Sequence, residues 1–117
     1  MAQLQPKRIS PKDLSSWLNQ EVTKPFLIDV REEEELNIAP FPAQAMHLPL
    51  SQVNNRLKNL QVEIPKDKSV VVICHKGIRS WNFGMWLLEQ EFGYDVWNLD
   101  GGIDAWSTEI SPETPRY

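Results

Sequence analysis

The sequence predicts an α/β fold in which a mainly parallel sheet carries helices on both of its faces. Short apolar runs alternate along the chain with segments of helical period, and this alternation is typical of parallel sheets. The run at 70–73, Val-Val-Val-Ile, is apolar at every position, as expected of a strand covered on both faces. The 117 residues contain no linker, so we expect one domain over 1–117 with an ordered core from about 7 to 107.

A helix and a buried strand open this pattern. Ser10 can cap a helix that has Pro11 at its first position, where the missing N–H of proline is not needed. The largely apolar run 26–30, which includes Asp29, follows as a short buried strand. Residues 31–36 can form one helical turn, and the acidic run at 32–35 predicts a solvated face.

Prolines shape the middle of the chain. Three of them exclude a continuous helix over 38–49, which we expect to be a loop leading into a short extended piece near 46–48. Ser51 can then cap a further helix that runs to about Leu60.

The second half repeats the alternation after the strand 70–73. A helix is predicted over 78–91, closed by Gly93, and a strand over 94–99. A turn and a short helix over 103–106 follow, and the polar tail from Ser107 is expected to fray. Apolar residues at helical spacing predict the core face of the long helix: Trp81, Met85, Leu88 and Phe92.

Composition limits the classes of function. A net charge of −4 without a basic stripe argues against nucleic-acid binding. No apolar run reaches the roughly 20 residues that span a bilayer, so we expect no membrane segment and a cytoplasmic protein. The single cysteine and the distant pair His47 and His75 show no metal-ligand spacing, so we expect neither a metal nor another cofactor.

The single cysteine, Cys74, stands where the strand 70–73 ends and the next helix begins. Ligand sites of parallel sheets lie at the carboxyl ends of the strands. Gly77 lets the chain curl there, so that backbone N–H groups and the helix N-terminus can converge on the sulfur. Lys76 and Arg79 add positive charge, and we expect the thiol to ionise more readily than a free cysteine and to act as a nucleophile. Ser80 could hold the curl by bonding a loop amide or carbonyl.

Structural interpretations of the same residues remain open at this point. A lone cysteine is by default a small buried hydrophobe, although its place between strand and helix favours catalysis. Arg79 could be a structural cap partner instead of an anion-binding residue, and Lys76 could simply be solvated. His75 could tune the neighbouring thiol or point outward.

Five segments in this order resemble single-domain rhodaneses, the thiosulfate sulfurtransferase family. The most specific is 74–80, Cys-His-Lys-Gly-Ile-Arg-Ser, which resembles the active-site loop of that family. The others are 9–14, 27–32 with Asp-Val-Arg, 47–50, and 94–106 with its Gly-Gly and final tryptophan. The chain departs from the family at 40–45, where Pro-Phe-Pro-Ala-Gln-Ala replaces the common Gly-His-Ile-Pro-Gly-Ala.

The resemblance implies a three-layer α/β/α domain with a mainly parallel, five-stranded sheet. It also implies that Cys74 is catalytic and carries a persulfide between two half-reactions. The donor would be thiosulfate or a persulfide, and the acceptor would be cyanide, a thiol or a sulfur-carrier protein in a relay. The residues implied in substrate binding form the loop: His75, Lys76, Gly77, Ile78 and Arg79.

The resemblance assigns different tasks to the polar side chains. Arg79 and Lys76 would hold the anionic end of the donor and stabilise the departing sulfite. Asp29 and Arg31 would support the loop and the acidic turn through hydrogen bonds without touching the substrate.

Two other functions stay open. Cysteine-based phosphatases, with arsenate reductase as a further possibility, have a similar loop with five residues between cysteine and arginine. This chain has four, which favours a sulfur atom over a phosphoryl group. The remaining alternative is a non-catalytic or sulfur-relay module that docks with a sulfur-donating protein.

Overall fold

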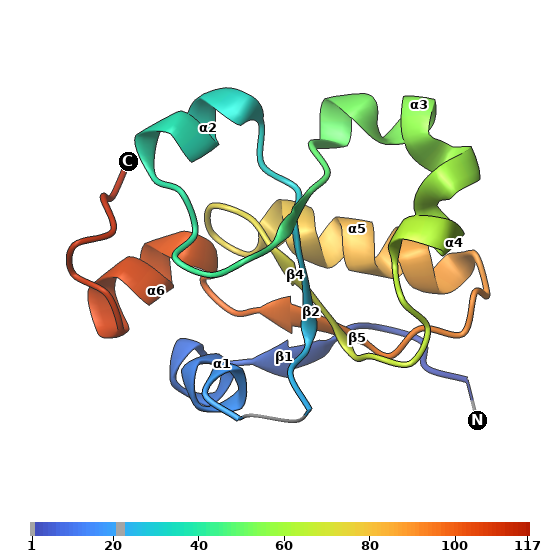
Figure 1. Cartoon of the computed structure of the whole chain (residues 1–117), viewed down its shortest axis with the longest axis horizontal. Coiled ribbons are helices and arrows are strands. Elements are labelled where there is room, and N and C mark those ends of the chain that lie inside the picture. The colour runs from blue at the N-terminus through green and yellow to red at the C-terminus, as the bar shows by residue number, and fades with distance from the viewer. Residues whose placement is uncertain (1, 21–22) are drawn as a thin grey trace.

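A computed structural model of the chain describes residues 2–20 and 23–117. Within these ranges five strands form one sheet in the order β1-β5-β4-β2-β3, and every neighbouring pair is parallel (Figure 1). The predicted α/β class and parallel sheet are therefore confirmed. The strands are β1 (Lys7–Ile9), β2 (Phe26–Asp29), β3 (Met46–His47), β4 (Val70–Ile73) and β5 (Val96–Leu99).

The helices differ widely in length. They are α1 (Pro11–Leu18), α2 (Glu33–Ile38), α3 (Val53–Arg56), α4 (Leu60–Glu63), α5 (Ile78–Glu89) and α6 (Gly102–Glu109). Two 3-10 turns, η1 (Leu50–Gln52) and η2 (Leu57–Asn59), precede and follow α3. Among the described residues, no helix combines the length and the apolar character needed to cross a bilayer.

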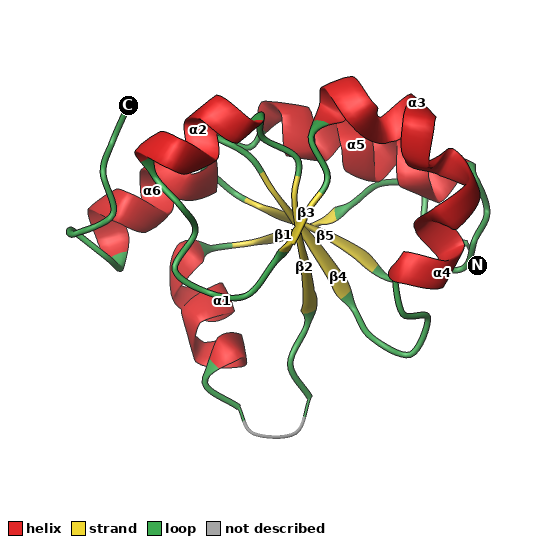
Figure 2. Ribbon diagram, turned by 45° about the horizontal axis from the view of Figure 1, so that its top comes forward, coloured by secondary structure: helices red, strands yellow, loops and turns green. Residues whose placement is uncertain are grey.

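The sheet separates two hydrophobic cores. Successive residues of a strand point to opposite faces, so Val70 and Val72 enter the core below α5, whereas Val71 and Ile73 enter the core with α1 and α6. Figure 2 shows α1 and α6 on one side of the strands and α3, α4 and α5 on the other. The predicted helices on both faces are present, and Cys74 continues the alternation on the α5 side.

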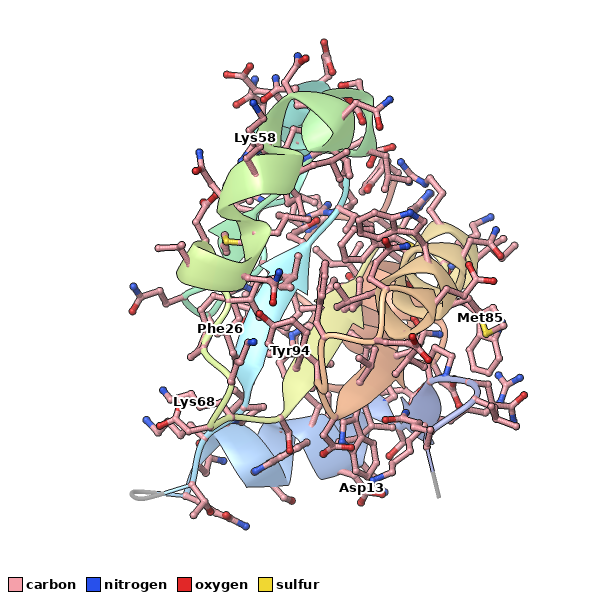
Figure 3. The ribbon with its side chains drawn as sticks, turned by 90° about the vertical axis from the view of Figure 1, so that its right-hand side faces the viewer. Asp13, Phe26, Lys58, Lys68, Met85 and Tyr94 are labelled. Carbon is pink, nitrogen blue, oxygen red and sulfur yellow. The ribbon has the colours of Figure 1, made fainter. Side chains whose placement is uncertain are left out.

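One buried tyrosine ties the α5 side together. Tyr94, which is labelled near the centre of Figure 3 and is buried, donates its hydroxyl proton to the carbonyl of Ile64 at 2.9 Å. The bond satisfies a backbone carbonyl directly after α4. A buried hydroxyl that finds such a partner fixes the position of the α4 end over the sheet.

The strand order places a crevice next to Cys74. β2 and β4 are neighbours, but the chain leaves β2 towards β3 on one side and leaves β4 towards β5 on the other. Such a reversal opens a crevice at the carboxyl ends of the two strands. Asp29 pairs in register with Ile73, so the residues after β2 and the loop after β4 meet at this point.

One expectation about local structure is wrong, and one strand lies outside the predicted elements. The single helix predicted from Ser51 to Leu60 is broken into η1, α3, η2 and α4 over residues 50–63. Asparagines at 54, 55 and 59 are weak helix formers, and 3-10 turns interrupt the segment. The strand β1, before α1, is not predicted from the residue pattern. It buries only Ile9 and exposes Lys7 and Arg8, so it contains no apolar run.

The tail, for which we expect fraying, makes specific contacts with the rest of the domain. α6 extends to Glu109, beyond the predicted 103–106, and the tail then returns towards α2 (Figure 1). The buried Ser107 hydroxyl donates to the carbonyl of Thr114, and Arg116 pairs with Asp104 at 2.9 Å. The first of these contacts is buried and the second is exposed, and the composition of the tail indicates neither.

The remaining boundaries shift by a few residues. α2 begins at Glu33 rather than at residue 31, α5 ends at Glu89, and β5 begins at Val96. The predicted core face is confirmed only in part: Trp81, Met85, Leu88 and Phe92 are all only partly buried, and of these Leu88 and Phe92, the latter beyond the end of α5, pack against the core. The buried residues of this helix recur at i, i+3, i+4 and i+7: Ser80, Phe83, Gly84 and Leu87.

Asp95, directly before β5, makes the stability of the domain slightly dependent on pH. Burial alone would raise the pKa of Asp95, but hydrogen bonds from Lys7, Ser69 and Trp97 outweigh it and lower the pKa below the ordinary 3.8. The ionised carboxylate is therefore favoured in the folded state. Its contribution to stability is present above the ordinary pKa and is lost as the pH falls through the lowered one.

We therefore expect Asp95→Asn to be less stable than the wild type at pH 7 and to lose this deficit in acid. The side chain is 39% exposed, so the difference should stay below about 1 kcal/mol. Urea unfolding of both proteins at pH 7 and near pH 3 measures it. A deficit that is the same at both pH values would contradict this assignment.

Candidate active site

The loop after β4 curls around the sulfur of Cys74. This residue is only 1% exposed, and the backbone N–H of Gly77 donates to Sγ at 3.1 Å. Gly77 has a φ of +94°, and a Cβ at this position would lie 3.1 Å from the backbone nitrogen of Gly101. The curl therefore needs a residue without a side chain, both for its backbone angle and for space.

The N-terminus of α6 holds the loop from behind. The N–H of Ile103 donates to the carbonyl of Cys74 at 2.9 Å, and the N–H of Asp104 donates to the carbonyl of His75 at 3.0 Å. Both carbonyls are thus engaged by α6 instead of facing the sulfur. Gly102 makes this approach possible, because its Cβ would stand 2.5 Å from both carbonyl oxygens.

Two buried polar side chains complete the surroundings of the sulfur. The Ser80 hydroxyl lies 3.2 Å from Sγ of Cys74 and 2.5 Å from Oδ1 of Asn98. Asn98 in turn donates from Nδ2 to the carbonyl of Gly77 at 3.1 Å. The expectation that Ser80 bonds a loop amide or carbonyl is wrong, because its partners are the sulfur and a side chain of β5.

Arg79 lies on the first turn of α5 and forms an ion pair with a residue of α2. Its guanidinium pairs with Glu35 at 3.0 Å. Burial, the largest single effect, opposes the positive charge, but the hydrogen bond that Arg79 donates to Glu35 and the attraction to that carboxylate together raise the pKa of Arg79 above its ordinary value. The prediction of a solvated acidic run is therefore wrong for Glu35, whose side chain is only 23% exposed. Lys76 and Ile78 are both exposed beside the same loop.

Asp29, the last residue of β2, and Arg31, just beyond it, form a buried ion pair. Nε and Nη2 of Arg31 donate to the Asp29 carboxylate at 3.0 and 2.9 Å, and the side chains are 0% and 3% exposed. Burial, the largest single effect, disfavours the charge of Arg31, yet the hydrogen bonds that it donates to Asp29 and Tyr117, with the attraction to Asp29, raise its pKa above the ordinary value. Neither residue bonds the Cys74 loop directly among the described hydrogen bonds.

Tyr117 connects this ion pair to the loop. Its hydroxyl accepts a hydrogen bond from Nη1 of Arg31 at 3.0 Å, and its ring stacks on His75 with centroids 3.9 Å apart. Burial, the largest cause, raises the pKa of Tyr117 above its ordinary 10. His75 keeps its Nε2 buried without a hydrogen-bond partner among the described residues. The support predicted for Asp29 and Arg31 thus reaches the loop through the tail.

Two surface pockets lie at opposite ends of the sheet, and only one of them is next to the Cys74 loop. One of about 320 Å³ is bordered by Arg79, Phe83 and Trp86, next to the loop. A larger one of about 460 Å³ lies at the amino ends of β2 and β4, bordered by Phe26 and Lys68. The larger hollow is therefore at the opposite end of the sheet from the sulfur. In the described part of the chain, no group of three acidic, histidine or cysteine residues could hold a metal ion.

Comparison with known proteins agrees with this geometry. The family model described as "Rhodanese-like domain" matches residues 10–109. The chain belongs to the rhodanese-like domain family. The match covers both the ion pair after β2 and the cysteine loop after β4, so the resemblance seen in the sequence is confirmed.

Relatives of this rhodanese-like domain include sulfurtransferases. The putative sulfurtransferase YtwF of Bacillus subtilis is 39% identical over 75% of this chain and 79% of its own length. The thiosulfate sulfurtransferase GlpE of Pseudoalteromonas translucida is 30% identical over 76% of this chain and 90% of its own length. A crystal structure of a rhodanese-related protein from Thermoplasma volcanium has a TM-score of 0.69 and 28% identity, covering 93% of this chain and 95% of that one.

These relatives support sulfur transfer as the general activity of this rhodanese-like domain. Some other relatives are much longer, and the chain spans only 30% or 24% of their length.

Several residues of the site escaped the sequence pattern. Asn98 lies inside a strand, Glu35 inside an acidic run, and Tyr117 in the polar tail. Each reaches the site through tertiary contacts that no local spacing reveals. The Gly-Gly pair at 101–102 was predicted as a turn and as part of a family motif, but its close approach to the cysteine loop was not, although two glycines at a helix start are a usable signal for one.

Proposed function

We propose that this rhodanese-like domain transfers sulfane sulfur from thiosulfate, or from a persulfide donor, through a persulfide on Cys74. The observation that carries the proposal is the environment of Sγ at the carboxyl end of β4. A backbone N–H and a hydroxyl lie within hydrogen-bond distance of it, and the neighbouring carbonyls are bound by α6. Such donors favour negative charge on the sulfur.

The first half-reaction is a displacement at sulfur. The Cys74 thiolate attacks the outer sulfur of thiosulfate, and a new S–S bond forms. The bond between the two sulfur atoms of thiosulfate breaks, and its electron pair leaves with sulfite. The negative charge then resides on the outer sulfur of the persulfide, within the curl formed by His75, Lys76, Gly77, Ile78 and Arg79.

The cations beside the loop bind the donor in this proposal. Lys76 is exposed and can meet an incoming anion at the surface. Arg79 already holds Glu35, and a doubly charged donor competes with this single carboxylate for the guanidinium. Asp29 and Arg31 support the site from within and take no part in binding.

The second half-reaction gives the sulfur to an acceptor. A thiophilic nucleophile attacks the outer sulfur and returns the S–S electron pair to Cys74. We propose cyanide or a small thiol as the soluble acceptor and a sulfur-carrier protein as the relay partner. A lone cysteine with this task needs a reducing compartment, which supports the cytoplasm as its place of action.

Intact-mass measurement tests the proposal. Freshly reduced protein incubated with thiosulfate should gain the mass of one sulfur atom, and cyanide should remove it. Cys74→Ser should gain nothing, because it lacks the sulfur that attacks the donor. An unchanged mass of the wild type with both thiosulfate and a small persulfide would refute the proposal. Turnover of an aryl phosphate that disappears in Cys74→Ser would point to a phosphatase instead.

A further inference from the structure

Asn98 occupies the centre of β5 and is 3% exposed, yet it does not touch the sulfur in any described contact. We propose that Asn98 is a positioning residue that competes with Cys74 for the hydroxyl proton of Ser80. The competition makes Ser80 stabilise the Cys74 thiolate but not the persulfide. The catalytic meaning of this inference rests on the proposed function.

The orientation of the Asn98 amide follows from its partners. The carbonyl of Gly77 lies 3.1 Å from one end of the amide, and a carbonyl can only accept a hydrogen bond. This end must therefore be the NH₂ group. The other end, Oδ1, faces the Ser80 hydroxyl at 2.5 Å and can itself only accept.

Ser80 has one hydroxyl proton for two acceptors. Its oxygen lies within hydrogen-bond distance of Oδ1 of Asn98 and of Sγ of Cys74. Ser80 is fully buried, so bulk water does not supply a replacement donor. Whenever the proton turns to one acceptor, the other loses its partner.

The charge on the sulfur decides the competition. A neutral thiol is a weak acceptor, so the proton points to Asn98. A thiolate attracts the proton more strongly than a neutral amide oxygen does, because hydrogen bonds to charged groups are about twice as strong. In the persulfide the charge lies on the outer sulfur, and the proton of Ser80 returns to Asn98.

This behaviour assists the release of sulfur. When an acceptor attacks the outer sulfur, the S–S bond breaks and its electron pair moves to Sγ of Cys74. The Ser80 hydroxyl turns towards Sγ as this charge grows, without transferring its proton. The interaction is thus stronger in the transition state than in the persulfide, which is the condition for accelerating the step. Asn98 keeps the hydroxyl in place between the two states.

A double-mutant cycle on alkylation tests the inference without any sulfur transfer. The rate of Cys74 alkylation by iodoacetamide is measured against pH in the wild type, Ser80→Ala, Asn98→Ala and the double variant. Ser80→Ala should move the half-maximal pH upward by about one unit, since the thiolate loses a donor. Asn98→Ala should move it downward by about half a unit or more, since the competitor for the proton is gone.

Comparing the effect of Asn98→Ala in the wild type and in Ser80→Ala shows whether Asn98 competes for the Ser80 proton or only supports the loop. In Ser80→Ala, the further change Asn98→Ala should not move the half-maximal pH downward, because no proton is left to release. The inference is overturned if Asn98→Ala causes the same shift in both backgrounds, or an upward shift in the wild type. If Asn98→Ala does not fold by circular dichroism, Asn98→Leu, which fills the same space without an acceptor, is measured in the same two backgrounds and judged by the same criteria.

The proposed function and this inference can fail separately. A wild type that takes no sulfur from thiosulfate or a persulfide refutes the function, whatever the alkylation shows. A wild type that loads sulfur while the two variants show no coupling refutes only the role of Asn98. If both hold, Ser80→Ala should also release sulfur to cyanide about tenfold more slowly than the wild type.

Discussion

Gly102→Ala is expected to abolish sulfur loading of Cys74 and to lower the free energy of unfolding by about 3 kcal/mol or more. A Cβ at this position would lie 2.5 Å from the carbonyl oxygens of Cys74 and His75. These atoms are backbone and cannot move aside without breaking their bonds to α6. The loop would have to separate from the helix, and its carbonyls would be free to turn towards the sulfur.

Gly93→Ala is the matched control for this prediction. Gly93 has a φ of +88°, compared with +60° for Gly102, but a Cβ there meets nothing within 4 Å. Its substitution should cost about 1–2 kcal/mol from backbone strain alone and leave sulfur loading intact. Urea unfolding and intact mass after thiosulfate treatment measure both variants. Equal stability and equal loading of the two would show that the contact between α6 and the loop is unimportant.

Arg31→Met is expected to destabilise the domain by about 3–5 kcal/mol, because it leaves the carboxylate of Asp29 buried and unpaired. The pair is 0% and 3% exposed, so water cannot replace the guanidinium without opening the fold. The substitution also removes the hydrogen bond to Tyr117 that holds the tail over His75. Urea unfolding measures the loss of stability.

An exposed ion pair provides the comparison. Arg8 lies 3.5 Å from Asp100, with side chains 65% and 43% exposed, so Arg8→Met should cost less than about 1 kcal/mol. Replacing Asp29 by leucine together with Arg31→Met should recover part of the lost stability, because no charge is then left unpaired. A small effect of Arg31→Met, equal to that of Arg8→Met, would contradict the assignment of a buried supporting pair.

The parts of the fold that the sequence predicted are those with strong local patterns. β4 is apolar at all of its positions and α1 has a clear start, and both lie close to their expected places. β1 escaped because an edge strand that buries only Ile9 has no apolar run. The broken segment 50–63 and the packed tail depend on tertiary partners, which override weak local preferences.

The site likewise has local features, which the sequence predicts, and long-range contacts, which it does not. The strand-to-helix position of Cys74 and the turn at Gly77 are local features, and the sequence was sufficient to select them. The partners of Ser80 and Arg79 come from β5 and α2, 18 and 44 residues away. Such contacts follow from the strand order and from side-chain packing, neither of which a spacing pattern contains.

A crystal structure of the thiosulfate-treated protein, with sulfur located by anomalous scattering, tests the central claim most directly. We expect a second sulfur atom bonded to Sγ of Cys74 and surrounded by the backbone N–H groups of the loop. The carbonyls of Cys74 and His75 should still accept their bonds from α6. An unmodified Sγ in fully treated crystals, or a loop carbonyl that faces the added sulfur, would contradict the proposal that this loop holds a persulfide.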